Sequence, residues 1–89
     1  MLSSRELERY VRGFSNHRRI DILKLLAIDP DLSLEDISRA LDANYKTIND
    51  HTRRLSAAGL IKKRNRGAAV EHALTKRGRF VLKFLRTLS

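Results

Sequence analysis

The stretch from Asn44 to Leu60 restricts the fold of this chain more than any other segment. Asn44 is a favourable N-cap, because its side-chain oxygen can accept a hydrogen bond from a free backbone N–H in the first turn of a helix. Gly59 suits the left-handed conformation that often follows the last turn. The residues between these two positions therefore predict a helix over positions 45–58.

This predicted helix has an apolar side and a polar side. Ile48, Thr52 and Leu55 fall within a narrow arc at about 100° per residue, and Ala58 joins them at the end. The opposite side is polar and offers donors, acceptors and cations: Lys46, Asn49, Asp50, Arg53 and Ala57, flanked by Tyr45 and Arg54. A solvated core helix would also have a polar side, so the neighbouring segments must decide whether this side binds a partner.

A short helix and a tight turn come directly before it. Ser33 with Asp36 forms a capping box, which predicts a helix that extends to about Leu41. The residues expected to face inward on it are Leu34, Ile37, Ala40 and Leu41. Only Asp42 and Ala43 remain before Asn44. Two short helices joined by so short a turn, here over residues 34–58, predict a helix-turn-helix, whose second helix lies in the major groove of DNA.

The chain becomes extended after Gly59. Two strand-like runs, Leu60–Arg64 and Val70–Leu74, are separated by five residues that include Gly67, which predicts a hairpin or "wing" over residues 60–74. We expect Leu32 to pair with this hairpin as a single strand residue. Four cations fall in five positions of the wing and could reach phosphates or the minor groove: Lys62, Lys63, Arg64 and Arg66. The alternative is a surface hairpin with solubilising lysines.

Three further helices complete the predicted fold. Ser3 with Glu6 forms a capping box for a helix over residues 3–14, and Thr75 caps a helix over residues 75–88. A central helix follows a cap at Ser15 or Asn16 and extends from His17 to about Ile28, with a broad apolar side made of Ile20, Ile22, Leu23, Leu26 and Ala27. The chain 1–89 is thus predicted to be a single domain, mainly α with a small β-hairpin, in the winged helix-turn-helix order α-α-(β)-α-α-β-β-α.

The charge of the chain is strongly asymmetric. The net charge is +9, but residues 1–43 carry seven basic against eight acidic residues. Residues 44–89 carry twelve basic residues against Asp50 and Glu71 alone. A charge imbalance confined to one half favours a face that binds a polyanion, and nucleic acid ranks ahead of an acidic membrane surface.

Several classes of protein are disfavoured. The chain has no apolar run near the roughly 18 residues of a membrane span and no signal-peptide core at its beginning, so we expect a cytoplasmic protein without membrane contact. It has no cysteine, which excludes disulfides and thiolate metal sites. Paired carboxylates, a nucleophile with its base and a phosphate-binding glycine loop are all missing from the sequence, so we do not expect an enzyme.

Three segments carry a resemblance to a known family. Residues 17–27 read HRRIDILKLLA, residues 34–61 read LEDISRALDANYKTINDHTRRLSAAGLI, and residues 72–78 read HALTKRG. Together they resemble the core helix, the recognition segment and the strand-to-helix close of ArsR-like winged-helix transcription regulators. MarR-like families share parts of these motifs. The resemblance covers most of the chain and implies a winged helix-turn-helix fold.

The resemblance also implies roles for residues of the helix 45–58, which we call the recognition helix. Its family positions correspond to Lys46, Thr47, Asn49, Asp50 and His51. Family behaviour implies that Tyr45, Lys46, Asn49 and Asp50 lie nearest the base edges, with Arg53 and Arg54 towards phosphate. This agrees with the chemistry of asparagine towards adenine and lysine towards guanine. Asp50 is a departure, since an acid facing DNA must accept from cytosine or hold Lys46 or Arg54 in place.

Many ArsR relatives sense metals, and this chain lacks the residues for that role. The family's thiolate site needs cysteines, and its other site needs Asp, His or Glu on the last helix, where residues 75–89 have none. His17, His51 and His72 lie on three different elements without ligand spacing. We therefore expect no metal and no cofactor, and we expect His51 to support the recognition helix through a hydrogen bond.

Two apolar stripes on the terminal helices exceed what the predicted core needs. They could be core or interface, and we expect the helices to pair across a two-fold axis through Leu7, Tyr10, Val11, Phe14, Phe80, Phe84, Leu85 and Leu88. The resemblance implies a homodimer too, with recognition helices about 34 Å apart on a pseudo-palindromic site. The predicted function is a dimeric, sequence-specific double-stranded DNA-binding transcription regulator, acting as a repressor. The alternative is a winged-helix module for protein docking or RNA binding.

Overall fold

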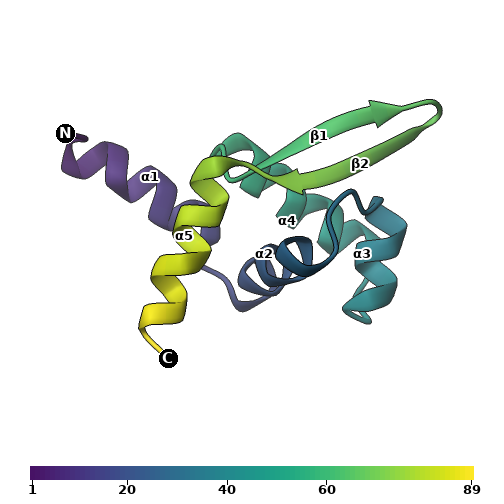
Figure 1. Ribbon diagram of the computed structural model, residues 1–89, viewed down its shortest axis with the longest axis horizontal. Helices are drawn as coiled ribbons and strands as arrows, with labels where there is room; N and C mark the ends of the chain where they lie inside the picture. Colours follow the sequence, from purple (N-terminus) through teal and green to yellow (C-terminus); the bar gives the residue numbers. More distant parts are fainter.

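The computed structural model describes residues 1–89 and contains five helices and one hairpin in the predicted order (Figure 1). The mainly helical winged helix-turn-helix fold is thereby confirmed. The elements are α1 (Ser4–Phe14), α2 (His17–Ile28), α3 (Leu34–Ala40), α4 (Tyr45–Ala57), β1 (Ile61–Arg66), β2 (Ala69–Leu74) and α5 (Lys76–Thr87).

Every helix begins at a side-chain cap that the sequence predicts. The side chains of Ser3, Asn16, Ser33, Asn44 and Thr75 each accept a hydrogen bond from a backbone N–H in the first turn. The two serines form complete capping boxes with Glu6 and Asp36. These caps satisfy donors that would otherwise have no partner, so the starts of the helices are set by local chemistry.

The hairpin is longer and its turn tighter than the sequence suggests. β1 and β2 pair antiparallel from Ile61↔Leu74 to Arg66↔Ala69, which leaves only Gly67 and Ala68 in the turn. Gly67 has φ +62°, and a positive φ at the first central position matches the two-residue hairpin turns that continue the strand twist. The predicted five-residue loop over residues 65–69 is therefore wrong. The predicted pairing of Leu32 is confirmed, because it forms a bridge with His72.

The core lies between α2, α4, the base of the hairpin and α5. Ile22, Leu23, Ile48, Leu55 and Leu60 are completely buried in it. Two residues predicted to face inward are instead exposed, namely Ala27 and Ala40. Each lies at the edge of its helix's apolar stripe, where no other element covers it, and the neighbouring Ile28 is 80% exposed for the same reason.

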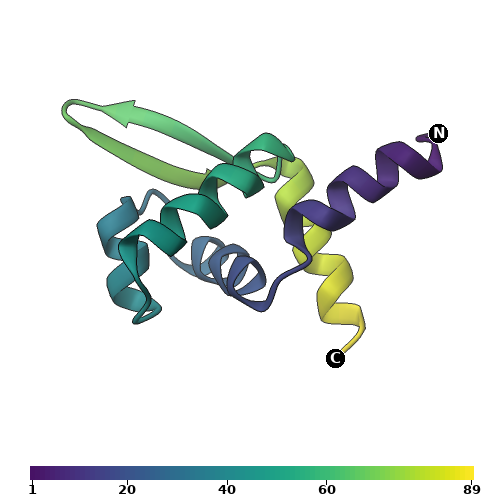
Figure 2. The same ribbon diagram turned by 180° about the vertical axis from the view of Figure 1, so that it is seen from behind.

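α2 lies between α4 and α5 and packs against both. α5 lies in front in Figure 1, and α4 lies in front when the molecule is turned around in Figure 2. α1 packs against the end of α4, where Gly13 lies so close to Ala58 that a Cβ at position 13 would collide with it. No helix of the chain has both the length and the apolar character that a membrane crossing requires.

Candidate nucleic-acid interface

The outer side of α4 is a continuous polar surface. Its buried side consists of Ile48, Thr52 and Leu55, which anchor the helix in the core. The sequence-predicted contact residues all lie away from that side: Tyr45, Lys46, Thr47, Asn49, Arg53 and Arg54 are exposed, and Asp50 is partly exposed. The structure thus brings these seven side chains together on one solvent-facing helix surface.

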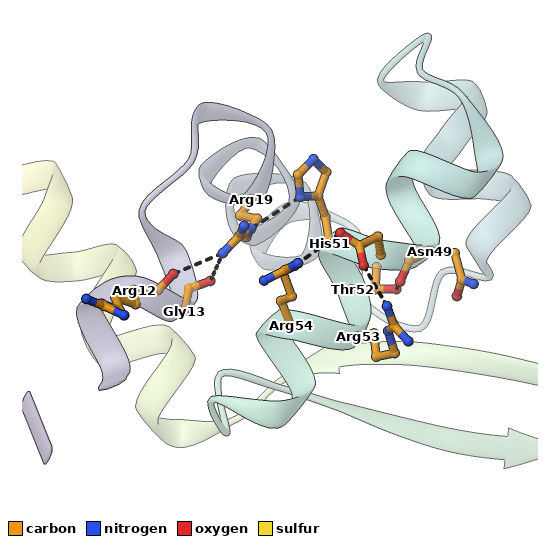
Figure 3. A network of polar contacts seen from close by, with 9 residues as sticks. Arg12, Gly13, Arg19, Asn49, His51, Thr52, Arg53 and Arg54 are labelled. Carbon is orange, nitrogen blue, oxygen red and sulfur yellow. Dashed lines mark hydrogen bonds and ion pairs between the residues drawn. The ribbon is translucent and has the colours of Figure 1, made fainter. Parts of the chain in front are cut away.

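Asp50 organises the middle of this surface. One carboxylate oxygen accepts a hydrogen bond from Arg53 at 2.7 Å, and the other accepts from Arg54 at 3.1 Å (Figure 3). The hydrogen bonds from Arg53 and then Arg54 lower the pKa of Asp50. The expected contact with Arg54 is confirmed, but the second partner is Arg53 and not Lys46. Two guanidinium groups are therefore held in defined directions by one acid.

A second network joins α4 to the helices behind it. The Arg19 side chain on α2 donates from Nε to His51 Nδ1 at 3.2 Å and from one terminal nitrogen to the backbone oxygens of Arg12 and Gly13, at 2.9 and 3.2 Å (Figure 3). The expected hydrogen bond of His51 is confirmed. Burial, and then the charge of Arg19, lower the pKa of His51, which keeps the ring neutral and able to accept. Arg19 thus connects the end of α1 to the recognition helix.

Sequence reasoning missed Arg19. Its partners lie 32, 7 and 6 residues away and belong to two other helices, so no local spacing reveals the contact. The one available signal is the position of an arginine beside the apolar side of a core helix, where its charge needs hydrogen-bond partners.

The cations of the wing fall on both of its faces. Lys63 pairs with buried His72 in the ladder and so shares the inner face of the hairpin, whereas Arg64 pairs with Glu71 on the outer face. Two of the four cations have acidic neighbours, since Arg64 lies 3.7 Å from Asp31 and Arg66 lies 3.7 Å from Glu71. Lys62 and Lys63 form no ion pair, and all four cations are exposed.

An open groove separates the recognition helix from the inner face of the wing. It has a volume of about 580 Å³, and its lining includes Tyr45, Asn49, Lys63, Val70 and His72. His72 Nδ1 lies 2.9 Å from the Leu32 oxygen, and burial lowers the pKa of this histidine. The groove therefore combines an aromatic ring, an amide and a cation, groups that together can contact a nucleic-acid backbone and its bases.

The terminal helices carry an apolar face that their own chain leaves open. The side chains of α1 and α5 line a groove of about 300 Å³ with Leu7, Val11, Phe80 and Phe84 among its walls. Phe80 is 72% exposed, and Leu88 is 70% exposed beyond the groove. Two of the predicted interface residues, Phe14 and Leu85, also pack partly against the core of their own chain, and Phe14 lines the groove as well.

One polar contact borders this open face. Arg77 of α5 lies 4.3 Å above the centre of the Tyr10 ring of α1, and its guanidinium also donates to the Tyr10 hydroxyl. A cation above an aromatic ring is attracted by the negative face of that ring. This contact holds the two terminal helices together.

The structure contains no group of three or more His, Asp or Glu side chains that could hold a metal ion.

The comparisons agree with this geometry. Residues 15–62, more than half of the chain, match the family of winged helix-turn-helix DNA-binding domains. The matched segment contains α2, α3 and all of α4, which are the elements that build and support the polar surface. The chain therefore belongs to the winged helix-turn-helix DNA-binding family.

Within this class the fold is ArsR-like. A homodimeric winged helix-turn-helix DNA-binding domain from Mycobacterium bovis, a possible ArsR-family transcriptional regulator, superposes with a TM-score of 0.84 at 22% identity, over 99% of this chain and 87% of that one. HlyU from Vibrio cholerae gives a TM-score of 0.82 at 24% identity, over 96% and 90% of the two chains.

A more distant neighbour was solved with nucleic acid. FabT from Streptococcus pneumoniae in complex with DNA gives a TM-score of 0.72 at 19% identity, over 79% of this chain and 51% of FabT. At these identities the similarity establishes the fold. The comparison with curated proteins found no match.

Proposed function

We propose that the protein is a sequence-specific regulator of transcription that binds double-stranded DNA as a homodimer and represses by occluding a promoter. The observation that carries this proposal is the outer surface of α4, where Asp50 orients Arg53 and Arg54 beside exposed Lys46 and Asn49. Phosphate contacts with fixed directions set the register in which Lys46 and Asn49 meet the base edges, and this favours readout of particular bases.

Each part of the surface has a separate task in this proposal. Tyr45, Lys46 and Asn49 read base edges in the major groove, with asparagine suited to adenine and lysine to guanine. Asp50 positions the two arginines or accepts from a cytosine amino group. The phosphate contacts fall to Thr47, Arg53, Arg54, Lys62, Lys63, Arg64 and Arg66, and the tip of the wing follows the backbone or enters the minor groove.

The open face of the terminal helices supports a homodimer. Exposed apolar side chains that gather in one place are typical of protein interfaces, and here they line a groove between α1 and α5. The Mycobacterium bovis domain of similar fold is homodimeric. In this arrangement Leu7, Val11, Phe80, Phe84 and Leu88 meet the partner, Tyr10 borders it through its contact with Arg77, and Phe14 and Leu85 support them from the core. A two-fold dimer requires an inverted repeat with half-sites about 34 Å apart.

Selection from randomised duplexes of about 30 base pairs tests the proposal, because that length holds two half-sites one helical turn apart. The expected result is enrichment of an inverted repeat. Lys46→Ala or Asn49→Ala should weaken binding to the selected duplex by about 1–3 kcal/mol, since each removes one base contact. Lys24→Ala is the matched control, because Lys24 is an exposed lysine of α2, away from the outer side of α4.

Three other outcomes would contradict the proposal. Salt-sensitive binding without an enriched sequence would indicate a general DNA-binding protein. Enrichment of single sites with no repeat would reject the dimer. Absence of DNA binding at low salt would favour the alternative module for protein docking or RNA binding, and a titration against single-stranded and structured RNA would separate those two. Transcription from a promoter that carries the selected site would then distinguish repression from activation.

A further inference from the structure

α5 is the most strongly charged helix of the chain, and the proposed DNA contact does not use it. It carries five basic residues and no acidic residue within twelve positions. At about 100° per residue, four of the five fall within an arc of about 80°. These four residues form what we call the α5 stripe, namely Lys76, Arg79, Lys83 and Arg86. The fifth, Arg77, lies on the side that contacts Tyr10.

The α5 stripe has no acidic partner within the chain. All four residues are exposed, and none of the six ion pairs of the structure involves α5. The only hydrogen bond from the stripe's side chains is from Arg79 to the Leu74 oxygen, at 3.4 Å. The positive charge of the stripe is therefore available to an external anion.

The basic residues at the beginning of α5 do not stabilise the helix through its dipole, whereas Arg86 in the last turn does. Lys76, Arg77 and Arg79 stand at the beginning of α5, and its first turn contains no acidic residue. Cations at the start of a helix face the positive end of its dipole, which is unfavourable. Helix stability therefore does not account for Lys76 and Arg79, and their charges are available to an anionic partner.

The helix α5 lies on a different side of the molecule from the recognition helix α4. α2 packs against both helices and separates most of α5 from α4. Figure 1 presents α5 in front of the molecule, whereas Figure 2 presents α4 in front. α5 also descends from the base of the wing towards the C-terminus, so Lys83 and Arg86 lie towards the end remote from the wing. A duplex bound along α4 and the wing therefore does not cover this part of the stripe.

We propose that the α5 stripe is a second, sequence-independent DNA-binding surface, which contacts the phosphates of a separate duplex and lets the protein bridge two DNA segments. The ten-residue span of the stripe covers about 15 Å, and duplex DNA presents one phosphate per strand for about every 3.4 Å of its axis. Four cations over this length match about four phosphates of one strand. Two of the four residues are lysines, which protein interfaces contain less often than the rest of the protein surface. The bridging activity goes beyond the proposed regulation of transcription.

A capture experiment with the full chain tests the proposal. The selected duplex is attached to beads and saturated with protein, and the retention of a labelled second duplex of unrelated sequence is measured at low and moderate salt. Lys83→Glu/Arg86→Glu should reduce retention at least tenfold and leave the affinity for the attached duplex within about twofold. Retention by the unchanged protein should fall steeply as salt is raised, because counterions are released from each phosphate contacted.

Arg5→Glu/Arg9→Glu is the matched control, since it makes the same change in charge on exposed positions of the other terminal helix. Retention should persist in this variant. An equal loss of retention in both double variants would show that retention depends on net charge alone and would overturn the proposed role of the α5 stripe. Unchanged retention in the α5 variant would overturn it as well.

A second measurement separates this proposal from the proposed function. Lys46→Ala/Arg53→Ala disables the recognition helix, and the remaining low-salt binding to a random duplex is followed by anisotropy. The proposal expects weak binding that falls at least tenfold further when Lys83→Glu/Arg86→Glu is added, with the cations of the wing supplying what remains. No remaining binding would overturn the α5 surface even if the recognition helix binds its site. Binding to vesicles with anionic lipids in place of the second duplex, lost on the same α5 change, would reassign the stripe to a membrane surface and also overturn the proposal.

Discussion

α4 and α5 are similar helices that use their side chains in opposite ways. Both follow a side-chain N-cap, and they contain 13 and 12 residues. The apolar side of α4 is completely covered by the core through Ile48, Thr52 and Leu55. α5 leaves Phe80 and Phe84 more than half exposed. One helix completes the fold of its own chain, and the other leaves part of its apolar surface exposed.

The charged residues of α4 and α5 also differ in whether they have partners within the chain. On α4, two arginines share Asp50 and point in defined directions. On α5, the basic residues have no acidic partner at all. Cations that an acid holds in place can fix the register of a helix on the duplex, whereas free cations neutralise any phosphate that comes near. The difference indicates that an acid on a DNA-facing helix need not oppose binding, since it can set the direction of the cations around it.

The largest expected effect concerns the buried side of α4. Ile48→Ala should lower the free energy of unfolding by about 2–5 kcal/mol, because it leaves a cavity in a fully buried site. Phe84→Ala should cost much less at protein concentrations where the chain is monomeric, since Phe84 is 52% exposed. Urea denaturation at two concentrations measures both. An equal cost for both variants at the lower concentration would show that α5 already buries its aromatic residues.

The next effect concerns the acid of α4. Asp50→Asn should reduce the discrimination between the selected and a random duplex by about 1–3 kcal/mol, because Arg53 and Arg54 lose their fixed directions and no longer hold Lys46 and Asn49 in register with the bases. Affinity for the random duplex should stay the same or rise, since a negative charge is removed. Titrations of both duplexes measure the ratio. Glu8→Gln, which removes the exposed Glu8–Arg12 pair of α1, is the control. Unchanged discrimination in Asp50→Asn would reject the role of Asp50 as organiser.

The pH dependence of the free energy of unfolding should come from histidines of α4 and the wing, because α5 has no histidine. Burial lowers the pKa of His51 and of His72 in the folded chain. Their contribution to stability is therefore fully present above the ordinary histidine pKa of about 6.5 and is lost as the pH falls through the lowered pKa values. The free energy of unfolding should fall as the pH decreases below about 6.5.

The measurement is the urea midpoint at several pH values for the unchanged chain, His51→Gln and His72→Gln. Each variant should reduce the loss of stability between about pH 6.5 and 5, where protonation of His51 would place a second cation against Arg19. The three carboxylates with lowered pKa, Glu6, Asp36 and Asp50, act at lower pH and do not interfere. A midpoint that is flat over this window in the unchanged chain would contradict the prediction.

The smallest expected effect concerns the first turns of α4 and α5. Lys76→Glu and Lys46→Glu should each raise the free energy of unfolding by about 0.3–1 kcal/mol at low ionic strength, because each replaces a cation near the positive end of a helix dipole by an acid. Only Lys46→Glu should abolish binding to the selected duplex. Urea denaturation and a duplex titration check the two expectations. Loss of specific binding in both variants would mean that the two helices contact the same duplex.

The sequence was most informative where the physics is local. The five N-caps, the apolar side of α4 and the left-handed Gly59 are all observed, since each depends on residues within one turn. Asp50 could be paired only in part, because several cations lie within its reach on one helix and side-chain directions decide among them. Lys46 was expected to compete for this acid, but Arg53 occupies the position.

Non-local features escaped prediction. The link from Arg19 to His51 joins residues of different helices, and no spacing in the sequence relates them. The strand ends were also misjudged, because the five polar and small residues around Gly67 suit a loose loop as well as a two-residue turn. The exposure of Ala27 depends on which elements happen to cover α2, which only the tertiary structure determines.

The contact between Gly13 and Ala58 has a consequence for the operators that this protein can accept. Because a side chain at position 13 has no space, α1 rests directly on the end of α4, and Arg19 ties the two helices at the same point. In a dimer joined through α1, the distance and orientation between the two recognition helices would then be fixed. The added methyl group of Gly13→Ala would push α1 away from the end of α4 and tilt the recognition helix relative to α1. The protein would then prefer half-sites with a different spacing.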